Sequence, residues 1–136
     1  QFYEILQKNL SMRHNVQPTH TLKELLLLKE LLPNRIKLFG AYIDEMIIAG
    51  AVMFECNERV TLAFYISQDY EHQNLRPLNL LFAEIIRWSI DMKYRWLDFG
   101  TYTLNNEPNL GLARFKESLG ARGIFRDTFS VKLSKM

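Results

Sequence analysis

Three runs of residues with period-2 alternation, separated by links of only two residues, constrain the fold of this chain more than any other feature. The runs are Arg35–Ile43, Met46–Cys56 and Arg59–Ser67, and all are rich in β-branched and aromatic residues. The links Asp44-Glu45 and Asn57-Glu58 have the length of tight hairpin turns. We therefore expect an antiparallel meander of three strands. On the third strand, alternation predicts one face with Val60, Leu62, Phe64 and Ile66 and another with Thr61, Ala63, Tyr65 and Ser67.

Helical patterns flank the meander. Thr21 and Glu24 have the spacing of a capping box, Pro77 suits a first helical turn, and Gly120 suits a helix end. We expect helices over Phe2–Asn15, from Thr21 to Pro33, over Pro77–Tyr94 and over Leu110–Leu119, and further strands over Arg95–Tyr102 and Arg122–Leu133. The order ααβββαβαβ predicts an α+β fold, with one mixed, mainly antiparallel sheet flanked by helices.

The chain has 136 residues, which is the length of one domain, so we expect a single domain over residues 1–136. Cys56 is the only cysteine, which excludes a disulfide framework. No apolar run approaches the ~20 residues of a membrane span, and no signal-peptide pattern opens the chain. We therefore expect no membrane span and a cytoplasmic location. Because the first residue is Gln1 rather than Met, we expect the chain to be a C-terminal part of a longer protein.

Charge is unevenly distributed along the chain. The net charge of +2 is too small to indicate duplex DNA as a partner. Residues 114–136 carry six basic and two acidic side chains, a charge of +4, which leaves −2 for residues 1–113. The basic end either meets a phosphate or carboxylate or forms a solvated surface.

Several familiar sites are excluded or weakly indicated. The triplet Asp98-Phe99-Gly100 occurs in protein kinases, but the glycine-rich loop, strand lysine and catalytic loop of a kinase are missing. His14, His20 and His72 lack the i, i+4 spacing of a helical zinc site, so we expect no metal and place these histidines at the surface or at caps. Cys56 has no adjacent histidine and is expected to be a buried structural thiol.

The segment Trp96–Ala121 carries the most informative pattern. The triplet D-F-G at 98–100 is followed by G-L-x-x-F-K-x-x-x-G-A at 111–121. With these motifs the chain resembles the GNAT acyltransferase superfamily, in its FemAB-like branch of peptidoglycan-bridge aminoacyltransferases. The order of elements is similar over nearly the whole chain, although the superfamily's first core strand is absent or upstream. The resemblance implies a GNAT-like fold and transfer of an acyl or aminoacyl group to an amine.

The sequence is compatible with two classes of acyl donor. Ordinary acetyltransferases have R/Q-x-x-G-x-G/A before the donor-facing helix, where backbone N–H groups and the helix N-terminus hold the coenzyme A pyrophosphate. Residues 73–78 read Q-N-L-R-P-L here, without either glycine and with a proline that has no N–H. FemAB-like transferases use aminoacyl-tRNA and lack that loop. No cofactor is therefore assigned. Acyl-CoA and aminoacyl-tRNA are the alternative donors, the second with tRNA as a partner, and the acceptor is a small molecule or cell-wall precursor.

The resemblance also implies site residues. Lys116 would stabilise negative charge on the attacked carbonyl oxygen; its alternative is a solvated helix position. Asp98 is either a base or the cap of the following loop. Arg76 can face a donor phosphate, and Phe115 is either core or part of the donor site. The residues expected to line the cleft are Tyr65, Tyr102 and Arg114.

Three functions are compatible with these patterns. The first is an N-acyltransferase. The second is a non-catalytic GNAT-like half-domain that binds substrate or supports a partner GNAT domain. The third is a module that binds nucleic acid or a carrier through the basic end, in which case tRNA binding should weaken steeply with salt.

Overall fold

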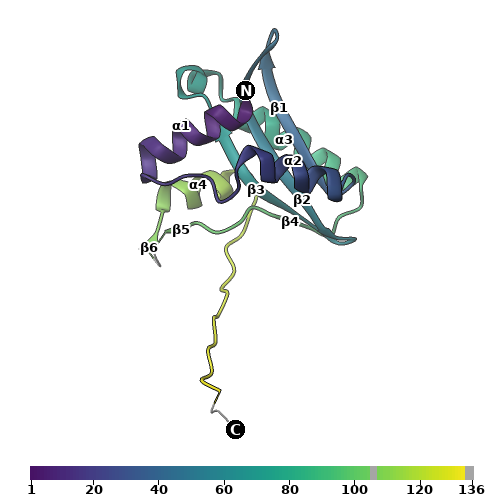
Figure 1. The fold of residues 1–136 in the computed structure, drawn as a ribbon, viewed down its shortest axis with the longest axis vertical. Helices are drawn as coiled ribbons and strands as arrows, with labels where there is room; N and C mark the ends of the chain where they lie inside the picture. The colour runs from purple at the N-terminus through teal and green to yellow at the C-terminus, as the bar shows by residue number, and fades with distance from the viewer. Residues whose placement is uncertain (105–106, 134–136) are drawn as a thin grey trace. The chain divides into compact units, whose positions relative to one another are not determined.

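The computed structural model describes residues 1–104 and 107–133 (Figure 1). Two compact units form, Gln1–Thr101 and a second that begins at Tyr102. The elements of the first are α1 (Phe2–His14), α2 (Leu22–Leu31), β1 (Ile36–Ile43), β2 (Met46–Asn57), β3 (Val60–Gln68), the 3₁₀ helix η1 (Tyr70–Leu75), α3 (Pro77–Asp91) and β4 (Trp96–Asp98). Those of the second are β5 (Thr103–Leu104), β6 (Glu107–Pro108) and α4 (Leu110–Ser118). The expectation for the His14 side chain lies outside the described residues.

The expected α+β architecture and the antiparallel meander are confirmed. β1, β2 and β3 pair antiparallel in a four-stranded sheet of order β1-β2-β3-β4. Asp44-Glu45 links β1 to β2 as predicted, with Asp44 in the left-handed conformation (φ 51°). The second link is Glu58-Arg59 rather than Asn57-Glu58. Asn57 still pairs with Val60, and its Oδ1 accepts a hydrogen bond from the Arg59 backbone N–H at 2.8 Å.

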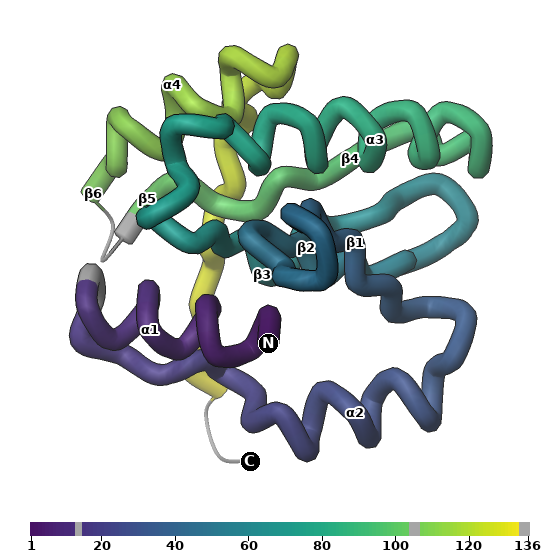
Figure 2. The backbone as a smooth tube through the Cα atoms, turned by 90° about the horizontal axis from the view of Figure 1, so that it is seen from above, coloured from purple at the N-terminus to yellow at the C-terminus, as the bar shows by residue number. Residues whose placement is uncertain are grey.

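Helices cover both faces of the meander (Figure 2). α1 and α2 lie on one face and α3 on the other. The α1 face holds a buried cluster of Phe2, Leu6, Ile36, Ile47, Val52 and Tyr65. On the α3 face, the helix buries Pro77, Leu81, Phe82, Ile85 and Ser89. The first unit therefore has an apolar layer on each side of its sheet.

The helix ends follow local backbone chemistry. The predicted capping box is present at α2: the Glu24 carboxylate accepts the Thr21 N–H at 2.7 Å, and the Thr21 hydroxyl accepts the Glu24 N–H at 3.2 Å. α3 ends at Asp91 rather than Tyr94, because Lys93 turns into the left-handed region (φ 61°). Within the described residues, no helix is long and apolar enough to cross a membrane.

β3 contains a β-bulge at Phe64, which the alternation pattern does not predict. Val52 of β2 pairs with Tyr65, whereas the next β2 residue, Met53, pairs with Ala63, so that Phe64 is an extra residue. Phe64 and Tyr65 therefore both face α1 and α2, and their ring centroids lie 4.7 Å apart. The two faces predicted for the side chains of this strand are correct up to Phe64. Beyond Phe64 each side chain lies on the face opposite to the predicted one, because an inserted residue reverses the alternation.

β4 is shorter than the expected strand Arg95–Tyr102 and runs parallel to β3. It ends at Asp98, whose Oδ1 accepts a hydrogen bond from the Gly100 N–H at 2.7 Å. Gly100 itself has a φ of 68°, which favours glycine. This tight turn takes the chain out of the sheet.

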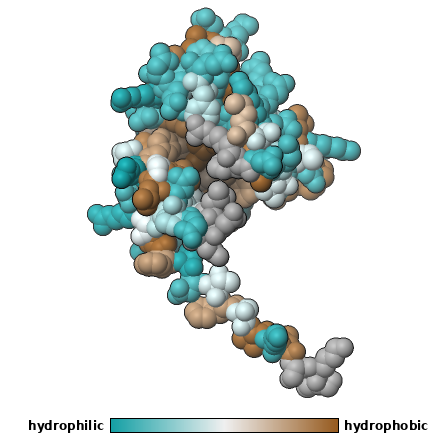
Figure 3. Space-filling model, turned by 90° about the vertical axis from the view of Figure 1, so that its left-hand side faces the viewer, coloured by the Kyte–Doolittle hydropathy of each residue, from teal (hydrophilic) through white to brown (hydrophobic). Residues whose placement is uncertain are grey.

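The segment Arg122–Leu133 is not the strand that its alternation predicted. It has no regular secondary structure, and it forms the extended yellow end of the chain in Figure 1. Its apolar side chains are exposed, with Phe125 at 101% and Phe129 at 88%, and hydrophobic side chains are visible along this end in Figure 3. A strand is stable only when its backbone groups find a partner, and no described residue pairs with this segment.

Candidate functional site

β3 has an open edge beyond its pairing with β4. The two strands pair over three positions and separate after Leu62 and Asp98. β3 continues to Gln68 with β2 as its neighbour on the other side. Among the described residues, Ala63–Gln68 therefore has no partner strand on the side of β4. The N–H and C=O groups of such an edge can bind an extended ligand as they would bind another strand.

The bulge at Phe64 lies inside this open edge. A bulge bends its strand and increases its twist, and bulges are frequent beside active sites. Phe99, just after β4, is buried and stacks on Phe82 of α3 with centroids 5.0 Å apart. The chain beyond β4 is thus held against α3 at Phe99, and a Cβ atom at Gly100 would lie 3.7 Å from the Ala63 carbonyl oxygen, so this chain still lies beside the first residue of the open edge.

The end of β3 leads through η1 to the N-terminus of α3. Arg76 is exposed and has a φ of 51°, and it caps a helix of 15 residues whose first residue is Pro77. A helix N-terminus carries a partial positive charge, and an arginine beside it adds a full one. This corner is therefore electrostatically suited to an anionic group.

The backbone donors between β3 and α3 are largely used by the loop itself. The Glu71 N–H bonds to the Asp69 carboxylate, the His72 N–H to the Asp69 carbonyl, and the Arg76 N–H to the Gln73 carbonyl. Asp69 also pairs with the His72 imidazole at 3.0 Å. Hydrogen bonds from the Glu71 N–H and from His72 lower the pKa of Asp69 despite partial desolvation. Residues Tyr70–Leu75 thus form the 3₁₀ helix η1, and the N–H groups of Glu71, His72 and Arg76 are used within this segment.

The predicted site residues of the first unit lie in different surroundings. Asp98 is half-buried at the start of the open edge. Its carboxylate accepts the Gly100 N–H, as expected if Asp98 caps the following loop. Arg76 lies at the α3 corner. Tyr65 is buried within the α1 face, where its hydroxyl accepts the backbone N–H of His20 at 3.1 Å and lies 3.0 Å from His20 Nδ1.

The predicted residues of the second unit sit on and before α4. Tyr102 and Arg114 are exposed and Phe115 is half-buried. Lys116 is buried, with 7% of its surface exposed, so the alternative of a solvated helix position is wrong. A lysine with so little exposure needs polar partners for its ammonium group, which suits a role other than surface solubility.

A cluster of polar groups lies at the other end of the sheet. Glu55 pairs with the ammonium group of Lys37 and accepts a hydrogen bond from the Tyr94 hydroxyl. Burial raises the pKa of Glu55, but these two hydrogen bonds outweigh it and hold the pKa below its ordinary value. Burial and the Glu55 carboxylate raise the pKa of Tyr94 to about 12. This cluster includes none of the predicted site residues.

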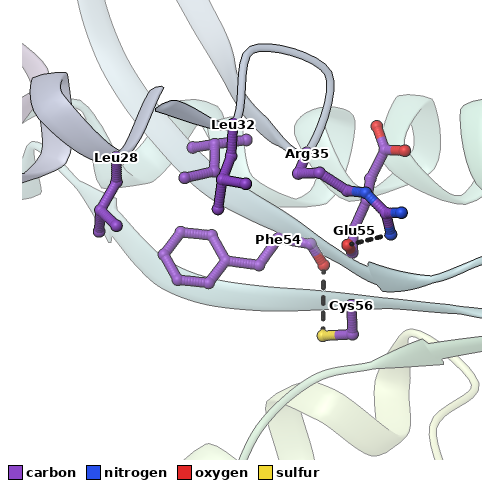
Figure 4. Close-up of a pocket in the computed structure, with 7 residues that line it drawn as sticks. Leu28, Leu32, Arg35, Phe54, Glu55 and Cys56 are labelled. Carbon is purple, nitrogen blue, oxygen red and sulfur yellow. Dashed lines mark hydrogen bonds between the residues drawn. The ribbon is translucent and has the colours of Figure 1, made fainter. Parts of the chain in front are cut away.

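An apolar groove lies beside this cluster, between α2 and the meander (Figure 4). Its lining residues are Leu28, Leu32, Arg35, Ile36, Phe54, Glu55 and Cys56. Cys56 is exposed rather than buried as expected, and its thiol points to the Phe54 carbonyl at 3.6 Å. Among the described residues, no three His, Cys, Asp or Glu side chains form a metal-binding group.

Sequence reasoning missed the open edge and the bulge. Neither is visible as a motif, because both arise from where strands stop pairing. One signal was available: Phe64 and Tyr65 are adjacent aromatic residues on a strand where large apolar residues should alternate.

Comparison with known proteins identifies a family. The family model for the acetyltransferase (GNAT) domain matches residues 1–129. No curated protein sequence matches the chain.

Solved structures share the fold at low sequence identity. The aminoglycoside N-acetyltransferase AAC(6')-Iy, in complex with the bisubstrate analog CoA-S-monomethyl-acetylneamine, has a TM-score of 0.66 and 20% identity, over 90% of this chain and 87% of that one. A GNAT family acetyltransferase from Elizabethkingia anophelis with acetyl-CoA bound has a TM-score of 0.55 and 22% identity, over 76% and 69%. An aminoglycoside acetyltransferase from an uncultured soil metagenomic sample, in complex with sisomicin, has a TM-score of 0.62 and 13% identity, over 96% and 88%.

Proposed function

The chain belongs to the acetyltransferase (GNAT) domain family, and from this premise we propose that it is an N-acyltransferase. In the proposed reaction, the nitrogen lone pair of an amine acceptor attacks the carbonyl carbon of an activated acyl donor. The bond from that carbon to the donor's leaving atom then breaks. The nitrogen loses one proton, and the leaving group gains one. The product is an amide.

The open edge of β3 is the observation that carries this proposal. An acyl donor lying along Ala63–Gln68 can exchange backbone hydrogen bonds with the strand, which fixes its carbonyl group in one orientation. Positioning of this kind lowers the barrier to attack, because the reacting atoms no longer have to find each other in solution. An anionic part of the donor would extend toward Arg76 and the N-terminus of α3.

We also propose roles for individual residues. Asp98, at the start of the open edge, takes the proton from the acceptor amine, either directly or through water. Lys116 stabilises the negative charge that develops on the carbonyl oxygen. Tyr102, Arg114 and Phe115 are assigned to substrate contacts by the sequence resemblance. Tyr65 supports the bulge from inside the α1 face rather than contacting the substrate.

The loop before α3 supports a donor other than coenzyme A thioesters. Three of its N–H groups bond within the loop, and Pro77 has none. A FemAB-like aminoacyl transfer is therefore the second candidate, with aminoacyl-tRNA as donor and an amine of a cell-wall precursor as acceptor. The structural neighbours suggest a different acceptor class, because AAC(6')-Iy is in complex with the bisubstrate analog CoA-S-monomethyl-acetylneamine and the soil metagenomic acetyltransferase with sisomicin.

A hydrogen–deuterium exchange experiment tests where the donor binds. Acetyl-CoA and aminoacyl-tRNA are added separately, and amide exchange is followed in β3 and β1. Binding at the proposed edge slows exchange in Ala63–Gln68. The outer edge of β1 is equally open among the described residues and should not respond. Protection of both edges, or of neither at saturating donor, contradicts the proposed site.

Two variants connect this site to turnover. Arg76→Gln removes a charge at the N-terminus of α3, and Arg87→Gln removes an exposed one from the middle of the same helix. We expect only the first to weaken the binding of an anionic donor. If a donor binds and no acceptor is acylated, the non-catalytic half-domain is the better description.

A further inference from the structure

His20, in the loop between α1 and α2, is anchored beside the open edge of β3 by hydrogen bonds to both α1 and β3. Its backbone N–H donates to the Tyr65 hydroxyl at 3.1 Å, and its carbonyl oxygen accepts the Tyr3 hydroxyl at 3.0 Å. Its ring nitrogen Nδ1 lies 3.0 Å from the same Tyr65 oxygen. The core elements α1 and β3 therefore fix the backbone and the ring of this loop residue.

The imidazole ring of His20 lies against the bulge. Its centroid is 5.5 Å from that of the Phe64 ring and 6.1 Å from that of the Tyr65 ring. Phe64 is 37% exposed and His20 is half-buried, so this side of the open edge is accessible to a small molecule. Loop residues that a rigid scaffold holds in place often carry binding functions.

The hydrogen bonds around the Tyr65 hydroxyl determine which ring nitrogen of neutral His20 carries the proton. The Tyr65 oxygen accepts the His20 backbone N–H, and the hydroxyl still has its own proton to donate. Tyr65 is buried, and among the described residues His20 Nδ1 is the acceptor within reach of that proton. Nδ1 therefore accepts, and Nε2 carries the imidazole proton. Nothing in the described part of the chain bonds to Nε2, so the Nε2–H is available to a ligand.

Asp98 lies on the same face of the sheet as His20. It pairs with Leu62, and Leu62 pairs with Phe54, which packs against the cluster on the α1 face. Directly paired residues share a face. The strand rises about 7–10 Å over the two to three residues from Leu62 to Phe64 and Tyr65. Two hydrogen bonds of about 2.9 Å, joined by a nitrogen and an oxygen about 3 Å apart on neighbouring carbon atoms, span a similar distance.

We propose that the Nε2–H of His20 donates a hydrogen bond to a hydroxyl oxygen of the amine acceptor, while the nitrogen of the acceptor lies at Asp98. His20 is thus a binding residue that selects amines with a hydroxyl group on the neighbouring carbon, and Tyr3 and Tyr65 are positioning residues. An amine without this hydroxyl gives up the hydrogen bond. The inference rests on the proposed acyl transfer for its reaction, but acceptor binding can be measured without turnover.

Ethanolamine and ethylamine, which differ by one hydroxyl group, test the contact. The imidazole signals of the isotope-labelled chain are followed by NMR with no donor present. We expect neutral His20 in the Nε2–H form, and a Nε2–H signal that responds to ethanolamine at ~10-fold lower concentration than to ethylamine. Neutral His20 with its proton on Nδ1, or an equal response to both amines, overturns the proposal. The expected response without acylation by any donor supports the contact and contradicts the acyltransferase function.

Two substitutions of His20 separate ligand binding from anchoring of the loop. His20→Asn places an amide near the Nδ1 position, where it can keep a bond to Tyr65, and removes the group at Nε2. His20→Gln places an amide near the Nε2 position instead. We expect the asparagine variant to lose the preference for ethanolamine and the glutamine variant to retain it, with affinities from ligand-observed NMR. Retention of the preference in the asparagine variant, with both variants folded by circular dichroism, overturns the role of Nε2.

Tyr65→Phe tests the positioning role separately. The variant removes the hydroxyl that donates to Nδ1, so both neutral forms of the His20 ring should appear in the NMR spectra. The preference for ethanolamine should fall together with the population of the Nε2–H form. An unchanged imidazole spectrum in this variant overturns the assignment of Tyr65 as the residue that orients His20.

Discussion

The aromatic ring of Phe2, at the start of α1, occupies the space that a side chain at Gly50, in the middle of β2, would fill. A Cβ atom at Gly50 would lie 2.7 Å from Phe2 Cε2 and 3.0 Å from Phe2 Cγ. Both residues are buried. The first turn of α1 is therefore packed directly on the backbone of the central meander, and α1 is part of the core.

Gly50→Ala should destabilise the protein by about 1–3 kcal/mol, because an added methyl group in a packed core forces Phe2 or the strand to move. The measurement is urea unfolding followed by circular dichroism. Gly111→Ala is the control: its Cβ would lie 3.5 Å from Asn109 Oδ1, an ordinary contact, and alanine favours the helix. We expect it to be neutral or stabilising by up to about 1 kcal/mol. Equal losses in both variants would contradict the packing of Phe2 on Gly50.

Glu55 should make stability depend on pH on the acid side. Its pKa in the folded protein lies below the ordinary value of 4.5. The unfolded chain therefore takes up the proton first as pH falls. The stabilisation is complete above the unfolded pKa and is lost as pH falls through the folded one. Urea midpoints of Glu55→Gln should vary less with acid pH than those of the wild type, while Glu84→Gln, at an exposed pair with Arg87, should resemble the wild type.

Tyr94 should give the opposite dependence at alkaline pH. Its pKa is raised from 10.0 to about 12 in the folded protein, so folding favours the neutral phenol. This stabilisation is complete below pH 10.0 and is lost as pH rises toward about 12. Absorbance at alkaline pH should show a tyrosine ionisation near pH 12. Tyr94→Phe should remove that step, and its persistence in the variant would assign it to another tyrosine.

Acetyl-CoA should bind weakly, with a Kd well above the micromolar range. A micromolar site corresponds to about −8 kcal/mol, and several backbone donors to the pyrophosphate are used within the loop here. Titration calorimetry with acetyl-CoA is the measurement. Micromolar or tighter binding would show that donors outside this loop hold the pyrophosphate.

Lys116→Met should lower turnover ~100-fold or more if Lys116 stabilises the developing oxyanion. Methionine keeps an apolar stem of similar length, so the variant should stay folded. Lys116→Ala is less informative, because Lys116 is buried and its truncation also removes packing. Lys93→Met, at an exposed lysine, is the control. Unchanged turnover in Lys116→Met, with any donor and acceptor that react, would contradict the role.

The sequence predicted correctly those features that depend on residues close together in the chain. The meander, the capping box at Thr21 and Glu24 and the left-handed Gly120 depend on residues close in sequence, and the structure contains all three. The segment Arg122–Leu133 has an equally clear alternation, but a strand also needs a neighbour. Sequence pattern carries no information on whether that neighbour is present.

The site was predicted less well because its residues depend on long-range placement. Asp98 ends a strand that stops four residues before the expected end at Tyr102, because its carboxylate accepts the Gly100 N–H and the chain turns there. Tyr65 was expected in the cleft and lies in the core, because the bulge at Phe64 turns it toward α1. Lys116 was weighed as a solvated residue and is buried. Helical position alone could not distinguish these environments.

The bulge at Phe64 also fixes where this chain can change length. Deleting one residue before or after the bulge would rotate half of β3 and carry Tyr65 or Thr61 to the opposite face. Deleting Phe64 itself would leave both halves with their present neighbours on β2. In any alignment of this family to the chain, a one-residue gap in β3 therefore belongs at position 64, and sequences that carry the gap there would have a β3 that pairs with β2 without this bulge.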